Sequence, residues 1–335
     1  AGGWTCDAAL IHDAHSGQWW HSGPASRLPV LEARREHALI HPMRADQAEG
    51  TFAAQVSRVR DAILNGDLFQ ANIAQRWSGK LTGSPRALAV AALEASQARY
   101  GAIIERPDGA AVISMSPELF LEVDRCGGVV TRPIKGTLPR ERDPLELRRS
   151  EKDAAELAMI VDLMRNDLSR VCRPGSVRVV SAREIETHPA LHHAVAEVRG
   201  RLRHRVGVPE LLWATFPPGS VTGAPKVAAM RLIDALEGAP RGPYCGAVGC
   251  VADHGTAVFN VAIRTIVLDA PESDGTCTFR SSAGWGMVRD AGPAREEAES
   301  ELKRAVLDRT AQALSSAAGS TVTPHEAVAA SAARQ

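Results

Sequence analysis

The segment Thr131-Arg132-Pro133-Ile134-Lys135-Gly136-Thr137 joins a β-like run to a glycine turn and places a lysine at that turn. The β-like run starts at Gly127. The chain has only five lysines, against a large excess of arginine. An amine that loses its proton on desolvation can attack carbon, whereas a guanidinium stays charged. Lys135 is therefore a candidate nucleophile, and the alternative is an ordinary solvated lysine beside a turn.

Strand-like and helix-like segments alternate on both sides of this turn. Before it, Ala110 to Met115 and Leu119 to Val123 have the pattern of strands around a Ser-Pro-Glu corner. After it, Pro144 to Val171 has a helical pattern, with acidic residues early and arginine late as the helix dipole favours. Further strands are predicted over residues 176–186, 195–202, 246–253, 257–268 and 276–283, and further helices over 45–65, 85–97, 209–216, 221–236 and 293–314. Strands in series with helices between them indicate an α+β fold.

The bulk composition excludes several classes of protein. The 335 residues include 39 basic and 39 acidic side chains, so the net charge gives no electrostatic case for nucleic acid or for an anionic membrane. The apolar runs are too short to span a bilayer, and no secretory leader pattern opens the chain. The six cysteines form no CxxC pair and no zinc-like Cys/His spacing. We expect a cytoplasmic protein with reduced thiols.

Six sequence blocks occur in a fixed order between about Gly66 and Lys303. They are Ser116-Pro117-Glu118, Pro133 to Thr137, Met159 to Asp167, Gly219 to Lys226, Gly242 to Gly249 and Ala283 to Gly286. In order and spacing they resemble the chorismate-utilising enzymes, the family that includes anthranilate synthase component I, isochorismate and salicylate synthases, and aminodeoxychorismate synthase component I. This resemblance implies a two-lobed β-sandwich flanked by helices.

The resemblance also implies how the chain is divided. Residues 46–314 correspond to the chorismate-binding catalytic domain, and residues 1–45 to a remnant of an N-terminal outer-sheet region that is longer in relatives. Residues 315–335 are rich in Ala, Ser and Thr and are expected to form a flexible tail. We interpret the chain as a trimmed or naturally short member of the family, with its N-terminal part shortened.

Two helical segments carry acidic pairs that suit a divalent cation. Asp153 and Glu156 are three residues apart, and Glu296 and Glu299 repeat this spacing, so each pair projects carboxylates from one helical face. Carboxylate oxygens are typical ligands of Mg²⁺, although an isolated acidic pair is usually a solvated face. The resemblance implies that Glu156 and Glu299 bind Mg²⁺ directly and that Glu296 and Asp153 act through water.

Chorismate carries two carboxylates and a C4 hydroxyl that leaves poorly. Arg264 has a planar guanidinium suited to a bidentate contact, and glycines at 284 and 286 leave the backbone open to a carboxylate. The resemblance assigns Arg264 and Tyr244 to the enolpyruvyl carboxylate, and Gly284 and Gly286 to the ring carboxylate. It also places at the substrate Ser220, His193, Thr137, Gln70 and Lys303. The alternatives are a structural role for His193 and an i,i+4 ion pair for Lys303.

Two positions distinguish the reactions within this family. Water-adding members carry a lysine base where this chain has Gln70, so activation of water at C2 is not expected. Anthranilate synthases usually have alanine where this chain has Lys135, which leaves room for ammonia at C2. The resemblance therefore favours the aminodeoxychorismate synthase branch, in which Lys135 attacks C2 and ammonia replaces the hydroxyl at C4. Glu118 matches the general acid/base that protonates this hydroxyl.

The expected activity is Mg²⁺-dependent amination of chorismate to 4-amino-4-deoxychorismate, on the route to 4-aminobenzoate and folate or to a specialised metabolite. The chain has no Gly-x-Cys-x-Gly segment of a glutaminase, so ammonia is expected from a separate glutamine amidotransferase subunit or domain. Anthranilate synthase component I, or another C2-aminating relative, is the second hypothesis. The third is a non-catalytic fragment that binds chorismate or the glutaminase.

Overall fold

The computed structural model describes residues 5–6, 9–12, 18–24, 36–48, 50–188, 191–288 and 307–314. The chain divides into two compact units, Ala1–Glu36 and His37–Gln335. The first unit contains an antiparallel hairpin of β1 (Ala9–His12) and β2 (Trp19–Ser22). The second unit contains two larger sheets, and all the features described below lie in it.

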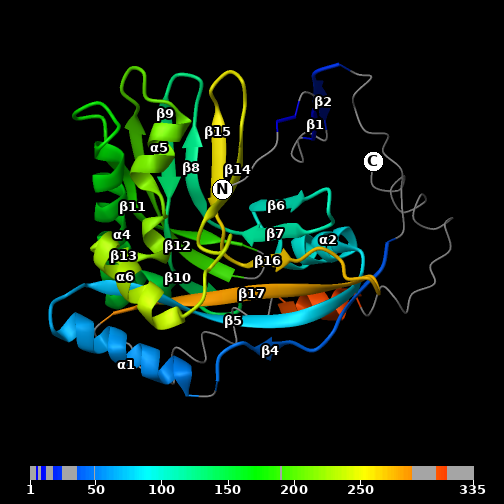
Figure 1. The fold of residues 1–335 in the computed structure, drawn as a ribbon. Coiled ribbons are helices and arrows are strands. Elements are labelled where there is room, and N and C mark those ends of the chain that lie inside the picture. Colours follow the sequence, from blue (N-terminus) through cyan, green and yellow to red (C-terminus); the bar gives the residue numbers. More distant parts are fainter. Residues whose placement is uncertain are drawn as a thin grey trace. The chain divides into compact units, whose positions relative to one another are not determined.

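One of these is a seven-stranded antiparallel sheet (Figure 1). Its strands are β8 (Leu119–Val123), β9 (Gly128–Arg132), β10 (Ile134–Pro139), β11 (Arg178–Thr187), β12 (Leu191–Arg201), β14 (Ala247–Val251) and β15 (Ala257–Val261). Their order across the sheet is β10-β12-β9-β8-β15-β14, and β11 also pairs with β12. The segment that holds Lys135 is thus strand β10, beside β12.

The other sheet has eight strands and is also antiparallel. Its strands are β3 (Ala38–Ile40), β4 (Arg44–Ala45), β5 (Gln70–Gly83), β6 (Tyr100–Glu105), β7 (Ala111–Ser116), β13 (Gly223–Ala224), β16 (Thr265–Leu268) and β17 (Thr276–Met287). The order is β13-β5-β17-β16-β7-β6, and both β3 and β4 pair with β5. Residues 38–45 therefore extend this sheet, while the predicted divisions at residues 45 and 314 stay predictions.

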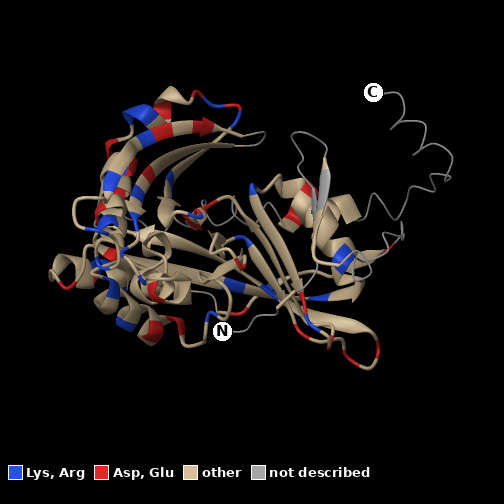
Figure 2. Ribbon diagram, turned by 90° about the horizontal axis from the view of Figure 1, so that it is seen from above, with Lys and Arg blue, Asp and Glu red and all other residues tan. Residues whose placement is uncertain are grey.

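Helices pack on both sheets. They are α1 (Thr51–Leu64), α2 (Pro85–Ser96), α3 (Leu145–Arg149), α4 (Glu151–Ser169), α5 (Val208–Thr215), α6 (Lys226–Glu237) and the short 3₁₀ turn η2 (Gly219–Val221). Helices α4 and α5 share a core with the seven-stranded sheet, and α2 shares one with β7, β16 and β17. Basic and acidic residues are interspersed along these elements (Figure 2). Within the described parts of the chain, no helix has both the length and the apolar character needed to cross a bilayer.

The pairing of β5 with β17 separates an apolar side from a polar side. Successive residues of a strand face opposite sides of the sheet. On one side Ile73 and Trp285 are buried in a core with α1, where Phe52 meets the Trp285 ring in an edge contact, 4.8 Å between centroids. The next pair along the register is Asn72 opposite Gly286. This alternation turns the polar pair away from the apolar core.

The predicted α+β fold is confirmed, but two predicted elements are interrupted. The helix expected over residues 144–171 breaks at Ser150, whose backbone is extended and whose hydroxyl accepts a hydrogen bond from the Asp153 amide at 3.2 Å. Serine favours this helix-capping role over a helix interior. The strand expected over residues 257–268 breaks before β16, because Arg264 adopts a left-handed backbone conformation with φ 49°. Strand β6 was not predicted.

A buried ion pair joins α6 to α4. The Nζ of Lys226 donates to Asp167 Oδ2 at 2.6 Å and to the Thr215 carbonyl oxygen at 2.8 Å. The lysine and aspartate side chains are only 15% and 5% exposed. Burial raises the pKa of the Asp167 carboxyl, and the contact with Lys226 opposes this shift. Lys226 thus supplies the positive charge that balances the buried Asp167 carboxylate.

Replacing Lys226 by methionine would leave Asp167 buried without its counter-ion. We expect the Lys226→Met variant to lose about 3–5 kcal/mol of unfolding free energy, the usual cost of removing one half of a buried pair. Urea denaturation measures this loss. The control is Lys80→Met, since Lys80 and its partner Glu272 are 46% and 50% exposed, and a change below about 1 kcal/mol is expected there. Equal losses of unfolding free energy in the two variants would contradict a stabilising role for the buried pair of Lys226 and Asp167.

Candidate active site

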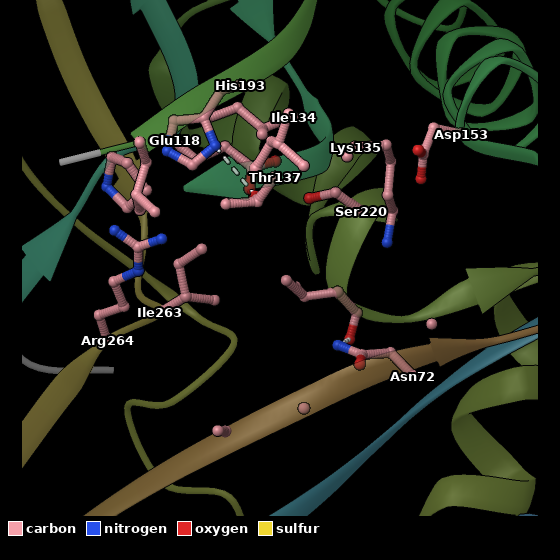
Figure 3. Close-up of a pocket in the computed structure, with 18 of the residues that line it drawn as sticks. Asn72, Glu118, Ile134, Lys135, Thr137, Asp153, His193, Ser220, Ile263 and Arg264 are labelled. Carbon is pink, nitrogen blue, oxygen red and sulfur yellow. Dashed lines mark hydrogen bonds between the residues drawn. The ribbon is translucent and has the colours of Figure 1, made fainter. Parts of the chain in front are cut away.

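A cavity of about 770 Å³ is lined by residues of both sheets and of α4 (Figure 3). The predicted site residues on its wall are Glu118, Lys135, Thr137, Asp153, Glu156, His193, Ser220, Tyr244, Arg264, Gly284 and Gly286. Gln70 lies against Gly286, behind the wall. Glu296, Glu299 and Lys303 fall outside the described residues. The structure gathers the described candidates in one place, and their individual roles stay predictions.

Two glycines of β17 form the floor of this cavity. A β-carbon added at Gly284 or Gly286 would come within 3.0 Å of two polar atoms from other segments. At the first position these are the Tyr244 hydroxyl (2.6 Å) and Asn72 Oδ1 (2.9 Å), and at the second Gln70 Nε2 and Lys135 Nζ (3.0 Å). Only glycine permits so close an approach. The polar ends of Tyr244, Asn72 and Lys135 therefore lie over a cavity floor that carries no side chain, and Gln70 packs against the same strand beside it.

Lys135 extends from β10 into the cavity and is half-buried (Figure 3). The following residue, Gly136, has φ 88°, and a β-carbon there would lie 3.2 Å from the Cβ of Asp153. The backbone of β10 can therefore pack closely against α4. This approach brings the amine of Lys135 and the acidic face of α4 to the same cavity.

Glu118 follows the Ser-Pro corner between β7 and β8, and only 4% of it is exposed. Burial raises the pKa of its carboxyl to about 7, against the opposing effects of Ser220, Lys135, the Ile134 backbone and Arg264. A carboxyl with this pKa is substantially protonated near neutral pH. Glu118 can therefore donate a proton to a leaving group, as a general acid must.

Arg264, at the break between β15 and β16, is a half-buried residue whose guanidinium is strongly desolvated. Burial, and then the nearby Arg309, lower the pKa of its guanidinium to about 10, while Glu118 opposes the shift. The group is still charged at neutral pH. A left-handed backbone at a non-glycine residue is costly and often marks a functional position. A buried guanidinium held in this way suits an anionic ligand group.

His193 is buried on β12, and its Nδ1 lies 3.0 Å from the hydroxyl of Thr137. Burial, followed by the positive charge of Arg264 and the neighbouring His188 and His192, lowers the pKa of His193 to about 3. The imidazole is therefore neutral at ordinary pH. It offers a ring face and a hydrogen-bonding nitrogen to a ligand, but no positive charge.

The acidic pair of α4 borders the cavity. Asp153 and Glu156 line it, and the Nζ of Lys152 lies 3.6 Å from a Glu156 oxygen. In the ranges that the structure describes, no three His, Cys, Asp or Glu side chains group closely enough to hold a metal. Carboxylate oxygens are the donors that Mg²⁺ prefers, and the ion often uses one or two of them together with water. Asp153 and Glu156, the two predicted ligands within the described residues, carry the oxygen donors that Mg²⁺ prefers.

Two features of this site were not predicted from the sequence. Asn72, 4% exposed, contributes its carboxamide to the cavity wall. Arg241 and Glu237 form a mostly buried ion pair at 2.6 Å behind that wall, with the guanidinium carbon 5.9 Å from the Tyr244 ring centroid. The available signals were the position of Asn72 two residues after Gln70 on a strand, and the i,i+4 spacing of the ion pair.

Similarity to known proteins assigns the family. Residues 5–309 match the family described as chorismate binding enzyme. The chain belongs to this family. The recognition made from the six sequence blocks is thus confirmed.

Individual members of the chorismate binding enzyme family are similar over most of this chain. It is 39% identical to "Aminodeoxychorismate synthase component 1" of Klebsiella aerogenes, covering 88% of this chain and 66% of the relative. It is 38% identical to "Anthranilate synthase component 1 1" of Haloarcula marismortui, covering 81% and 55%. The chain therefore spans only about half to two thirds of the length of these relatives.

A solved structure supports the predicted two-sheet architecture. Anthranilate synthase component I from Streptococcus pneumoniae TIGR4 superposes with a TM-score of 0.76 and 28% identity, covering 92% of this chain and 72% of that one. The menaquinone-specific isochorismate synthase MenF from Escherichia coli shares the fold, with a TM-score of 0.71 at 18% identity. The predicted fold of chorismate-utilising enzymes is confirmed.

The raised pKa of Glu118 predicts that stability falls as pH rises. Between the ordinary value of 4.5 and about 7, the unfolded chain has released the Glu118 proton while the folded chain still holds it. Folding is penalised across this window, by about 3 kcal/mol once pH exceeds the folded pKa. We expect Glu118→Gln to abolish this contribution, so that the variant gains stability over the wild type as pH rises from about 4.5 to about 8.

Chemical denaturation at pH values of about 4.5 and about 8 measures this difference in unfolding free energy. Glu122→Gln is the control, because Glu122 lies on the same strand region but is exposed. A wild type and a Glu118→Gln variant with parallel pH dependence of unfolding free energy would contradict the assigned pKa.

Proposed function

We propose that this protein aminates chorismate at C4, converting chorismate and ammonia to 4-amino-4-deoxychorismate and water. The observation that carries the proposal is the amine of Lys135 above Gly286, in the same cavity as the buried Glu118 carboxyl. Relatives named aminodeoxychorismate synthase component 1, at 37–39% identity, support it.

The proposed chemistry uses Lys135 as nucleophile and Glu118 as acid and base. The neutral amine of Lys135 forms a bond to C2, both conjugated double bonds of the ring shift, and the C4–O bond breaks as Glu118 protonates the hydroxyl, which leaves as water. Ammonia then forms a bond to C4, both double bonds shift back, and Lys135 leaves C2 as a free amine. The new C4 ammonium returns one proton to Glu118, which restores the starting state.

The substrate contacts follow from the charges that line the cavity. Arg264 and Tyr244 are proposed to hold the enolpyruvyl carboxylate, since Arg264 carries the desolvated guanidinium described above. Backbone amides at the two floor glycines would bind the ring carboxylate. Further contacts are proposed for Ser220, the neutral His193, Thr137, Gln70 and Lys303.

Mg²⁺ is the proposed cofactor. Glu156 and Glu299 would hold it directly, and Asp153 and Glu296 through water. When bound, the ion would offset negative charge on the dicarboxylate substrate.

Ammonia supply, pathway and location are parts of the same proposal. The name component 1 borne by the relatives implies a second component, which we propose to be a glutamine amidotransferase subunit or domain. The product would feed 4-aminobenzoate and folate synthesis or a specialised metabolite, in the cytoplasm.

Amination at C2, as in an anthranilate synthase, is the second candidate. Relatives named anthranilate synthase component 1 are up to 39% identical to this chain, so overall similarity does not separate the two reactions. The lysine at position 135 favours C4 amination, because the resemblance implies that anthranilate synthases usually have alanine there, which leaves room for ammonia at C2. A non-catalytic chorismate-binding fragment is the third.

Product analysis tests the proposal. The purified chain, chorismate, Mg²⁺ and an ammonium salt should give 4-amino-4-deoxychorismate, identified by chromatography and mass spectrometry. We expect Lys135→Ala to form none and Glu118→Gln to be slower by about 10²–10⁴-fold, the usual contribution of a general acid.

Lys80→Ala is the matched control, since this lysine pairs with Glu272 outside the cavity. Wild-type turnover in Lys135→Ala would overturn the nucleophile assignment. Anthranilate as product would favour the second candidate, and chorismate binding without turnover the third.

A further inference from the structure

The carboxamide of Asn72 has an unused hydrogen-bond acceptor on the cavity wall (Figure 3). Its Nδ2 donates to the Val221 carbonyl oxygen at 3.0 Å. Its Oδ1 is buried and receives no hydrogen bond from any described residue, and it lies 2.9 Å from the point that a β-carbon on Gly284 would occupy. A buried acceptor without a donor costs folding free energy, which a ligand could offset by donating a hydrogen bond.

The orientation of this carboxamide is fixed by its neighbours. Rotating the amide by half a turn would place Oδ1 against the Val221 carbonyl oxygen, so that two acceptors would face each other. The backbone of Asn72 is held as well, because its amide donates to the Thr222 carbonyl oxygen at 2.7 Å. The carboxamide of Asn72, a residue of the cavity wall, therefore presents Oδ1 as an acceptor and not as a donor beside Gly284.

Arg241 and Glu237 reinforce this arrangement. Arg241 Nη1 donates to the Val221 carbonyl oxygen at 3.0 Å, and its Nη2 donates to the Asn72 carbonyl oxygen. The Glu237 carboxylate accepts from Arg241 Nε at 2.8 Å and from the Ala74 amide at 2.9 Å. Burial alone would lower the pKa of the Arg241 guanidinium, but the contacts with Glu237, followed by those with Cys245 and Tyr244, raise it overall. The Arg241–Glu237 pair therefore holds both the backbone of β5 near Asn72 and the Val221 carbonyl that the Asn72 carboxamide contacts.

We infer that Asn72 is a further binding residue, whose Oδ1 accepts a hydrogen bond from an N–H or O–H group of the reactants. The inference rests on the proposed function. Under it, the carboxylates of chorismate are acceptors, so the ring carboxylate can meet the backbone amides of the floor glycines but cannot be the partner of this oxygen. The remaining donors are the C4 hydroxyl of chorismate and the N–H groups of ammonia. Both are small neutral donors, and the experiment separates them.

The test compares Asn72→Leu, which removes the acceptor oxygen at a similar side-chain size, with Asn72→Ala, which removes it without filling the space. Gln55→Leu is the matched control, because Gln55 is also 4% exposed, donates its amide to a backbone carbonyl and has a buried oxygen without a described partner, but does not line the cavity. The measured quantities are KM for ammonium, KM for chorismate, and the Kd of chorismate with Mg²⁺ in the absence of ammonium, obtained by calorimetry. Thermal unfolding checks that each variant is folded.

We expect Asn72→Leu and Asn72→Ala to raise the constants for the same reactant about tenfold, and Gln55→Leu to leave all of them unchanged. A rise in KM for ammonium alone identifies ammonia as the donor, and a rise in both chorismate constants identifies the C4 hydroxyl. Wild-type constants in folded Asn72→Leu, or an equal effect of Gln55→Leu, would overturn the inference.

If the wild type forms no aminated product, the proposed function fails separately. The calorimetric comparison then decides the role of Asn72, because it needs no turnover. A chorismate Kd about tenfold weaker in Asn72→Leu supports the inference, and an equal Kd overturns it.

Discussion

The site depends on one packing constraint, the approach of polar side chains to the bare backbone of β17. Gly284 and Gly286 lie two residues apart, so both face the same side of the sheet. A β-carbon at either position would occupy space next to the polar ends of Asn72 or Lys135. The opposite side of the same strand is filled by Trp285 against α1. The strand is therefore packed on one side and bare at these two positions on the other, which leaves space beside the amine of Lys135, the proposed nucleophile.

Burial sets the charge states around this floor. It raises the pKa of Glu118 to about 7, lowers that of His193 to about 3 and lowers that of Arg264 to about 10. At neutral pH the cavity thus combines a carboxyl that is substantially protonated, a neutral imidazole and a charged guanidinium. Such a set can hold an anion and also protonate a leaving hydroxyl. The folding free energy lost above the ordinary pKa of Glu118 is the cost of burying this carboxyl.

The sequence predicted the parts of the site that lie within short blocks. Lys135 and Glu118 were recognised because each stands in a sequence block, and Arg264 was named from the family resemblance. The strands and helices around them follow from periodicity and capping. The break before Arg264 was missed, since nothing local signals a left-handed residue in a β-branched run. Asn72 and the Arg241–Glu237 ion pair were missed because they depend on strand register and on packing between segments far apart in the chain. The contact of Arg241 with the Asn72 carbonyl oxygen on β5 is an example.

The most direct test of the account asks whether Lys135 forms a covalent bond with chorismate. The protein is mixed with chorismate and Mg²⁺ without ammonium, quenched in acid and digested, and the peptide that contains Lys135 is analysed by mass spectrometry. The account predicts a fraction of this peptide heavier by chorismate less one water, and loss of that fraction when an ammonium salt is added before the quench. Aminated product formed with ammonium, together with an unmodified Lys135 peptide in its absence, would contradict it.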